Sequence, residues 1–229
     1  MRYIALFGVV HLAACGLEPF PPCGGEVLVV TPRDIKQYGP DCWLQAPLLW
    51  MATFRPEVLG NQLHWDGTTL SVGLYDPSGK PHWVTVTQVD VNNFDSDSPL
   101  LPWAWPVGVQ VALEKQGINT RAPNDPAVAF VALSGVEAPD EAVAGFDGDT
   151  LKGILGQYKE HPTVACTVGS ATGNDATIPD SVVFEGHCYA VLGFNGKTVS
   201  LGNPWGYDDA AVSLSDFRRD FSFISQPLD

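Results

Sequence analysis

Two short segments near opposite ends of the chain constrain its fold more than any other feature. The first, residues 37–43, contains Cys42, and the second, residues 186–206, contains His187 and Asn203. A thiol, an imidazole and an amide in this chain order are the groups of a Cys–His–Asn triad, in which the histidine activates the thiol and the amide orients the imidazole. The pattern therefore predicts a fold that brings the front of the chain against its C-terminal part.

The residues around Cys42 predict the start of a buried helix. Cys42 follows a Gly-Pro turn signal and an aspartate, and an apolar run continues from it to Met51, with Pro47 expected in the first turn. A thiol at a helix N-terminus lies at the positive end of the helix dipole, so we expect a lowered pKa for Cys42. The alternative interpretation is a buried structural cysteine.

The C-terminal segment predicts a β-hairpin that carries the other two groups. Two apolar strands flank Asn195 and Gly196, and this dipeptide is a strong signal for a two-residue hairpin turn. His187 lies on the first strand and Asn203 just beyond the second, so we expect the two side chains to be neighbours. Trp205 would cover a hydrogen bond between them and exclude water. The alternative is an ordinary turn at Asn203, with Trp205 as plain core.

The remaining sequence predicts a mixture of helices and strands. Residues 63–91 alternate apolar and polar positions and predict a second hairpin. Residues 103–116 and 151–160 predict helices, residues 118–148 are expected to be rich in loops, and strands should dominate from residue 163 onward.

The motifs and their order resemble those of the calpain-like cysteine peptidases, in the reduced form found in bacteria. Residues 32–44 resemble the calpain stretch in which a glutamine, here Gln37, precedes the nucleophile motif. Four further segments resemble family motifs in the same order, namely residues 113–115, 186–189, 203–206 and 214–221. The resemblance extends from about Thr31 to Ile224.

The resemblance implies an α+β, papain-like fold. A helical lobe would carry Cys42, an antiparallel β lobe would carry His187 and Asn203, and the site would lie in the cleft between them. The implied activity is that of a cysteine endopeptidase, a hydrolase that cleaves protein or peptide substrates through a thioacyl-enzyme intermediate. Gln37 is implied as the donor of the oxyanion hole.

Two departures from the family pattern concern the segment before the nucleophile. Gln37 lies five residues before Cys42, where the family spacing is six, and Pro40 stands where glycine is usual.

Two other classes of function remain open. A catalytically weak or inactive lipoprotein that keeps the fold as a binding module would be expected to have lost a triad member, whereas all three are present. An acyl transferase of the transglutaminase type uses a similar thiol and imidazole but prefers aspartate to Asn203.

Cofactors are not required by this chemistry, and calcium is the one open question. The resemblance places Asp34 at the position of one acidic calcium ligand of calpains, and Asp208 and Asp209 where a second site draws acids. Adjacent aspartates are more commonly surface residues. No Cys and His spacing typical of a zinc site occurs, so we expect no zinc.

The N-terminus predicts a bacterial lipoprotein signal peptide over residues 1–14. Arg2 precedes a mostly apolar stretch, and Leu-Ala-Ala-Cys-Gly at residues 12–16 fits cleavage before a lipidated Cys15. A buried first strand is the alternative. Residues 15–25 would form a semi-rigid tether to a protease domain at 26–229. Glycine rather than aspartate after Cys15 favours the outer membrane, so we expect a lipid-anchored protein of the cell envelope.

The charge of the chain limits its possible partners, and its cysteine content limits its possible disulfides. A net charge of −14 and a pI near 4.5 argue against nucleic-acid partners, which require a basic face. If Cys15 is lipidated and Cys42 is a thiol, at most one disulfide can form among Cys23, Cys166 and Cys188. Pairing of Cys166 with Cys188 on neighbouring strands is one alternative, and two reduced buried thiols are the other.

Overall fold

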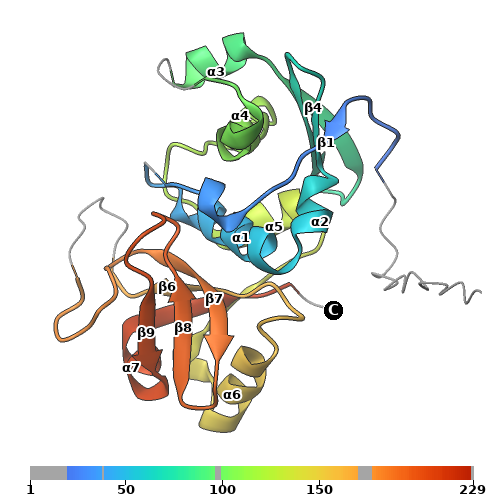
Figure 1. Cartoon of the computed structure of the whole chain (residues 1–229). Helices are drawn as coiled ribbons and strands as arrows, with labels where there is room; N and C mark the ends of the chain where they lie inside the picture. Colours follow the sequence, from blue (N-terminus) through green and yellow to red (C-terminus); the bar gives the residue numbers. More distant parts are fainter. Residues whose placement is uncertain (1–19, 38, 96–98, 170–176, 228–229) are drawn as a thin grey trace, which may run out of the picture.

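The computed structural model describes residues 20–227, apart from residue 38 and the segments 96–98 and 170–176. The expected signal peptide at 1–14, the lipidation site Cys15 and the first part of the tether lie outside the described residues. The described chain is a mixed α+β protein with seven α-helices and two antiparallel sheets (Figure 1). None of its described helices is long and apolar enough to cross a bilayer.

The strands of the two sheets are separate along the chain, since β1 to β4 form one sheet and β5 to β10 the other. The helices are α1 (Cys42–Phe54), α2 (Pro56–Gly60), α3 (Gln88–Phe94), α4 (Trp105–Lys115), α5 (Pro126–Ser134), α6 (Gly148–Gly156) and α7 (Leu214–Asp220), with short 3-10 turns η1 (Pro32–Asp34), η2 (Pro102–Ala104) and η3 (Val143–Gly145). The strands are β1 (Glu26–Val27), β2 (Leu63–Trp65), β3 (Leu70–Tyr75), β4 (Pro81–Val86), β5 (Asp140–Ala142), β6 (Val164–Thr167), β7 (Cys188–Phe194), β8 (Thr198–Gly202), β9 (Ala210–Ser213) and β10 (Phe221–Ser225).

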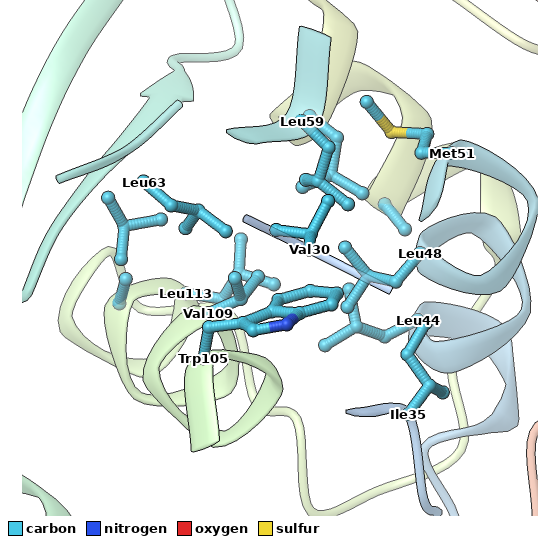
Figure 2. Close-up of a cluster of buried hydrophobic side chains, with 14 of the residues drawn as sticks. Val30, Ile35, Leu44, Leu48, Met51, Leu59, Leu63, Trp105, Val109 and Leu113 are labelled. Carbon is cyan, nitrogen blue, oxygen red and sulfur yellow. The ribbon is translucent and has the colours of Figure 1, made fainter. Parts of the chain in front are cut away.

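The first lobe combines helices α1 to α5 with a four-stranded sheet in the order β1-β2-β3-β4. The predicted hairpin is confirmed for residues 70–86, because β3 pairs with β4 and the turn closes at Gly79, whose φ is 78°. Residues 88–91, which were included in the prediction, belong instead to helix α3. The core of this lobe is a cluster of large apolar side chains from α1, α4 and the segments around them (Figure 2). Trp105 lies fully buried at its centre and packs among leucines and valines of both helices.

The second lobe is a six-stranded antiparallel sheet in the order β5-β10-β6-β7-β8-β9, with its own hydrophobic core. The predicted Asn-Gly hairpin joins β7 to β8, and Gly196 adopts the left-handed φ of 87° that this turn needs. The first strand is shorter than predicted, since β7 begins at Cys188. His187 therefore lies immediately before the strand and not within it.

Helix α1 connects the two lobes. It lies over β6 and β7 and also packs against α5 (Figure 1). Eleven of its 13 residues are buried, as expected for a helix that is apolar all round. The buried indole N–H of Trp50 donates to the Tyr158 carbonyl oxygen at 2.7 Å, which ties the helix to the end of the second lobe's helix α6.

Two helical details differ from the sequence-based expectation. Pro47 was expected in the first turn, but α1 begins at Cys42, so the proline lies in the second turn and deprives one carbonyl of its helical donor. Helix α5 occupies part of the region expected to be rich in loops. Its start at Asp125-Pro126 and its end at Gly135, which has a φ of 71°, carry the usual capping signals and could have been recognised.

Candidate active site

The thiol of Cys42 lies at the start of α1, facing the second lobe. Asp41 is the N-cap residue, and its carbonyl oxygen accepts from the amides of Leu44 and Gln45 at 2.9 and 3.0 Å. Cys42 is only 7% exposed, and α1 packs directly on β7. Cys42 is therefore held at a helix N-terminus that is buried between the lobes.

Burial dominates the acidity of this thiol. Burial raises the pKa of Cys42 to about 11. Nearby backbone N–H groups, that of Cys188 most of all, act in the opposite direction, and the Asp41 carboxylate adds to the increase. The expected lowering by the helix N-terminus is thus outweighed, and that expectation is wrong for the resting thiol. Ionisation near neutral pH requires a partner that takes the proton and leaves a compensating positive charge.

His187 and Asn203 lie side by side, as predicted. The Nε2 atom of His187 is 3.0 Å from Oδ1 of Asn203, and the two residues are 4% and 1% exposed. Because the backbone amide of Trp205 donates to the same Oδ1 at 3.1 Å, this oxygen is an acceptor and Nε2 must be the donor. In a neutral imidazole Nδ1 is then the basic nitrogen.

An aromatic cage surrounds the imidazole. The Trp205 ring lies 4.6 Å from the His187 ring, Tyr189 meets it edge-on at 4.7 Å, and Phe184 packs on Trp205 at 4.5 Å. Trp205 therefore packs on the His187 ring next to the hydrogen bond between His187 and Asn203.

The loop that carries Asn203 is itself held by a side chain. The Asn203 backbone amide donates to Oδ1 of Asp209 at 2.8 Å, and the Gly206 amide donates to the Asn203 carbonyl at 3.0 Å. Asp209 therefore braces the residue that orients the imidazole.

Gln37 joins the nucleophile segment to the Asn203 loop through its backbone. Its amide donates to the Pro204 carbonyl oxygen at 2.9 Å, which brings the two motifs together across the lobes. Its side-chain Nε2 donates to the Gly39 carbonyl oxygen at 2.5 Å. One of the two side-chain N–H groups is thus engaged within its own loop.

Two of the three calcium candidates, Asp34 and Asp209, accept hydrogen bonds within the protein, and the third, Asp208, is exposed. Oδ2 of Asp34 accepts from the Thr31 amide at 2.8 Å and from the Trp105 indole at 3.0 Å, while Asp209 braces Asn203 and Asp208 is exposed with a φ of 57°. Within the described ranges, no group of three or more His, Cys, Asp or Glu side chains could hold a metal ion. The described geometry gives no support to a calcium site at these three residues.

Cys166 and Cys188 form a disulfide between directly opposed positions of β6 and β7. This resolves the alternative that the sequence left open. Cys23 and Cys42 are the free cysteines among the described residues.

Asp41, the residue before Cys42, is a buried acid. It is 2% exposed, and its Oδ2 accepts from the side-chain amides of Gln45, at 2.9 Å, and Gln110. Burial raises its pKa from 3.8 to about 6, against the opposing effect of the Gln45 donor. The spacing of Asp41 and Gln45, one helical turn apart, was the available signal.

Among the described residues, the first lobe contributes to at least two cavities. The smaller, about 220 Å³, borders the nucleophile turn at Gly39, Pro40 and Asp41. The larger, about 650 Å³, lies between α5 and the β3–β4 turn, and its lining includes neither Cys42 nor His187.

Comparison with known proteins adds no identification: no family model and no curated protein matches the chain.

The buried Asp41 generates a pH prediction. Its pKa is raised in the folded protein, so between about pH 4 and pH 6 the folded state holds a proton that the unfolded state has lost, and the free energy of unfolding falls as the pH rises. Relative to wild type, Asp41→Asn should therefore gain about 3 kcal/mol of stability between pH 4 and pH 7. Denaturant unfolding across this range measures the difference.

A matched control is Asp149→Asn, whose side chain is 96% exposed and which should follow the wild-type curve. Parallel curves for wild type and Asp41→Asn would show that Asp41 does not titrate in this way.

Proposed function

We propose that the chain is a calpain-like cysteine endopeptidase with a papain-like fold, hydrolysing peptide bonds of protein or peptide substrates. One observation carries the proposal: the imidazole of His187 is hydrogen-bonded to Asn203 beside the Trp205 ring, and the next residue along, Cys188, packs in one buried cluster with Cys42. The motif order of the sequence supports the same assignment.

The catalytic cycle begins with proton transfer from Cys42 to Nδ1 of His187. A thiol whose pKa is about 11 is not ionised alone at pH 7, but the imidazolium that forms offsets the negative charge on sulfur in the buried site. The thiolate attacks the substrate carbonyl carbon, and His187 returns the proton to the leaving amine. Water, activated by the same imidazole, then hydrolyses the thioacyl-enzyme.

The oxyanion of the tetrahedral intermediate needs donors beside Cys42. The Cys42 backbone amide is at the first position of α1, where the helix supplies no acceptor. Gln37 has a second side-chain N–H besides the one bound to the Gly39 carbonyl oxygen. These two donors are proposed to form the oxyanion hole.

The lipid anchor is a further proposal, and the fold gives it a geometric consequence. Phe20 packs on Tyr75 and Trp83 at 4.9 and 5.2 Å, and the Trp83 indole donates to the Pro21 carbonyl oxygen at 2.7 Å. The chain is thus attached to the first lobe from Phe20 onward. A lipid on Cys15 would hold the domain within roughly 20 Å of the bilayer, since five residues span at most about 3.5 Å each.

The nucleophile assignment predicts that Cys42→Ala abolishes both peptide hydrolysis and covalent labelling by an electrophilic peptide probe. Cys23→Ser is the matched control and should retain both, because Cys23 lies in the segment before the domain and contacts none of the triad. Site-resolved mass spectrometry of the labelled protein reads the outcome. Labelling that persists in Cys42→Ala, or moves to Cys23, would remove the basis of the proposal.

The triad roles predict a graded loss of turnover. His187→Ala should lower kcat by about 1,000-fold or more, because no base remains, whereas Asn203→Ala should lower it by about 10- to 100-fold, because only the orientation of the imidazole is lost. Trp205→Ala should resemble Asn203→Ala, since water then competes for the same hydrogen bond. Turnover of one peptide by all three folded variants tests this order. A His187→Ala protein more active than Asn203→Ala would reverse the proposed roles.

The anchor predicts that the protein fractionates with membranes and that Cys15→Ser releases it. Acylation at Cys15, seen by mass spectrometry of the N-terminal peptide, is the direct measurement. An intact, unacylated Met1 terminus in the native host would contradict the anchor and leave the peptidase proposal untouched.

A further inference from the structure

The disulfide lies against the candidate nucleophile. One buried cluster, here called the cysteine cluster, contains both bonded cysteines and the free Cys42; its members are Cys42, Ala46, Phe130, Ala138, Val164, Cys166 and Cys188. Helix α1 contributes Cys42 and Ala46, and strands β6 and β7 lie beneath it (Figure 1). The proposed mechanism assigns no part to the disulfide.

The backbone amide of Cys188 points away from β6. Cys166 and Cys188 face each other with their Cα atoms 4.1 Å apart, and the flanking Thr167 amide donates to the His187 carbonyl oxygen at 2.9 Å. This is the pattern of a non-hydrogen-bonded antiparallel pair, in which the N–H groups point away from the partner strand. On that side Cys188 packs against Cys42 in the cysteine cluster, and its backbone N–H acts to lower the pKa of the Cys42 thiol.

A donor at this position has a large effect because the site is dry. Cys42, Cys166 and Cys188 are 7%, 3% and 6% exposed. A hydrogen bond to a developing charge is stronger in a buried environment than in water, and a charged sulfur without donors is costly there. The Cys188 amide therefore favours the thiolate form of Cys42 over the thiol.

We propose that the Cys166–Cys188 disulfide is a positioning element for the nucleophile and makes the site dependent on two redox states at once. Cys42 must be reduced to react, and the Cys166–Cys188 pair must be oxidised to hold the Cys188 amide against it. The link to hydrolysis rests on the proposed peptidase function, whereas the effect on Cys42 reactivity does not.

Reduction has a defined chemistry and a defined steric consequence. A dithiol reductant such as dithiothreitol supplies two electrons and two protons, the sulfur–sulfur bond breaks, two thiols form, and the reductant becomes a cyclic disulfide. Two unbonded sulfur atoms need van der Waals separation, and the close-packed cysteine cluster must shift to provide it. The Cys188 amide lies at the start of β7 and moves with it, and His187, the preceding residue, moves as well.

The test measures alkylation of Cys42 by iodoacetamide, from pH 6 to pH 10, in the full chain carrying Cys23→Ser. Three states are compared, namely oxidised, reduced with dithiothreitol and desalted, and reoxidised with oxidised glutathione. Site-resolved mass spectrometry separates Cys42 from the other cysteines and reports the disulfide state. The double variant Cys166→Ala/Cys188→Ala serves as the matched control that cannot respond to reductant.

We expect reduction to slow Cys42 alkylation at pH 7 about tenfold and to move the midpoint of its pH profile upward, with recovery on reoxidation. The double variant should stay at the slow rate in all three treatments. Unchanged or faster alkylation after reduction would overturn the proposal. Faster alkylation would also follow if the chain unfolds on reduction and exposes Cys42, and circular dichroism would identify that case. It too would overturn the proposal, because the disulfide would then have only a structural role.

Peptide hydrolysis measured on the same samples separates the two proposals. Alkylation that follows the expected pattern without any hydrolysis would defeat the peptidase function and leave the positioning role. Hydrolysis that continues at full rate in the reduced protein would defeat the positioning role and leave the peptidase.

Discussion

The burial of α1 between two lobes is the constraint on which the rest of the structure depends. A helix with eleven of 13 residues buried cannot bury all of its apolar surface against one partner. The lobe with the four-stranded sheet must therefore cover part of it and the six-stranded sheet the rest. The indoles of Trp43 and Trp50 donate to carbonyl oxygens of Ala122 and Tyr158, which fixes the helix along both lobes. The position of Cys42 follows from this arrangement, because the helix N-terminus packs beside Cys188 at the start of β7.

Much of the candidate site could be predicted because its signals are local. The Asn195-Gly196 turn sets the β7–β8 hairpin, and that hairpin alone makes His187 and Asn203 neighbours. The start of a helix at Cys42 was likewise readable from the turn before it and the apolar run after it. In these places propensity, turn chemistry and hydrophobic pattern agree.

The rest could not be predicted because it depends on contacts between distant segments. The pKa values of Cys42 and Asp41 are set by burial, which depends on elements far along the chain, and sequence reasoning could supply only the opposing helix dipole. The hydrogen bond from the Trp105 indole to Oδ2 of Asp34, 71 residues away, could likewise not be read from the sequence. The pairing of Cys166 with Cys188 also required the strand register, which hydrophobic pattern does not fix.

The attachment of Phe20 to the face formed by Tyr75 and Trp83 has a consequence for how an anchored enzyme would meet its substrates. A domain that a few residues join to a lipid searches a thin layer of space in two dimensions. Proteins in the same bilayer then present their cleavable segments at an effective concentration set by the tether, whereas freely diffusing proteins gain no such advantage. An anchored enzyme would therefore select membrane-bound over freely diffusing substrates through the length of its tether. This selectivity would not depend on contacts between the substrate and the side chains of the site.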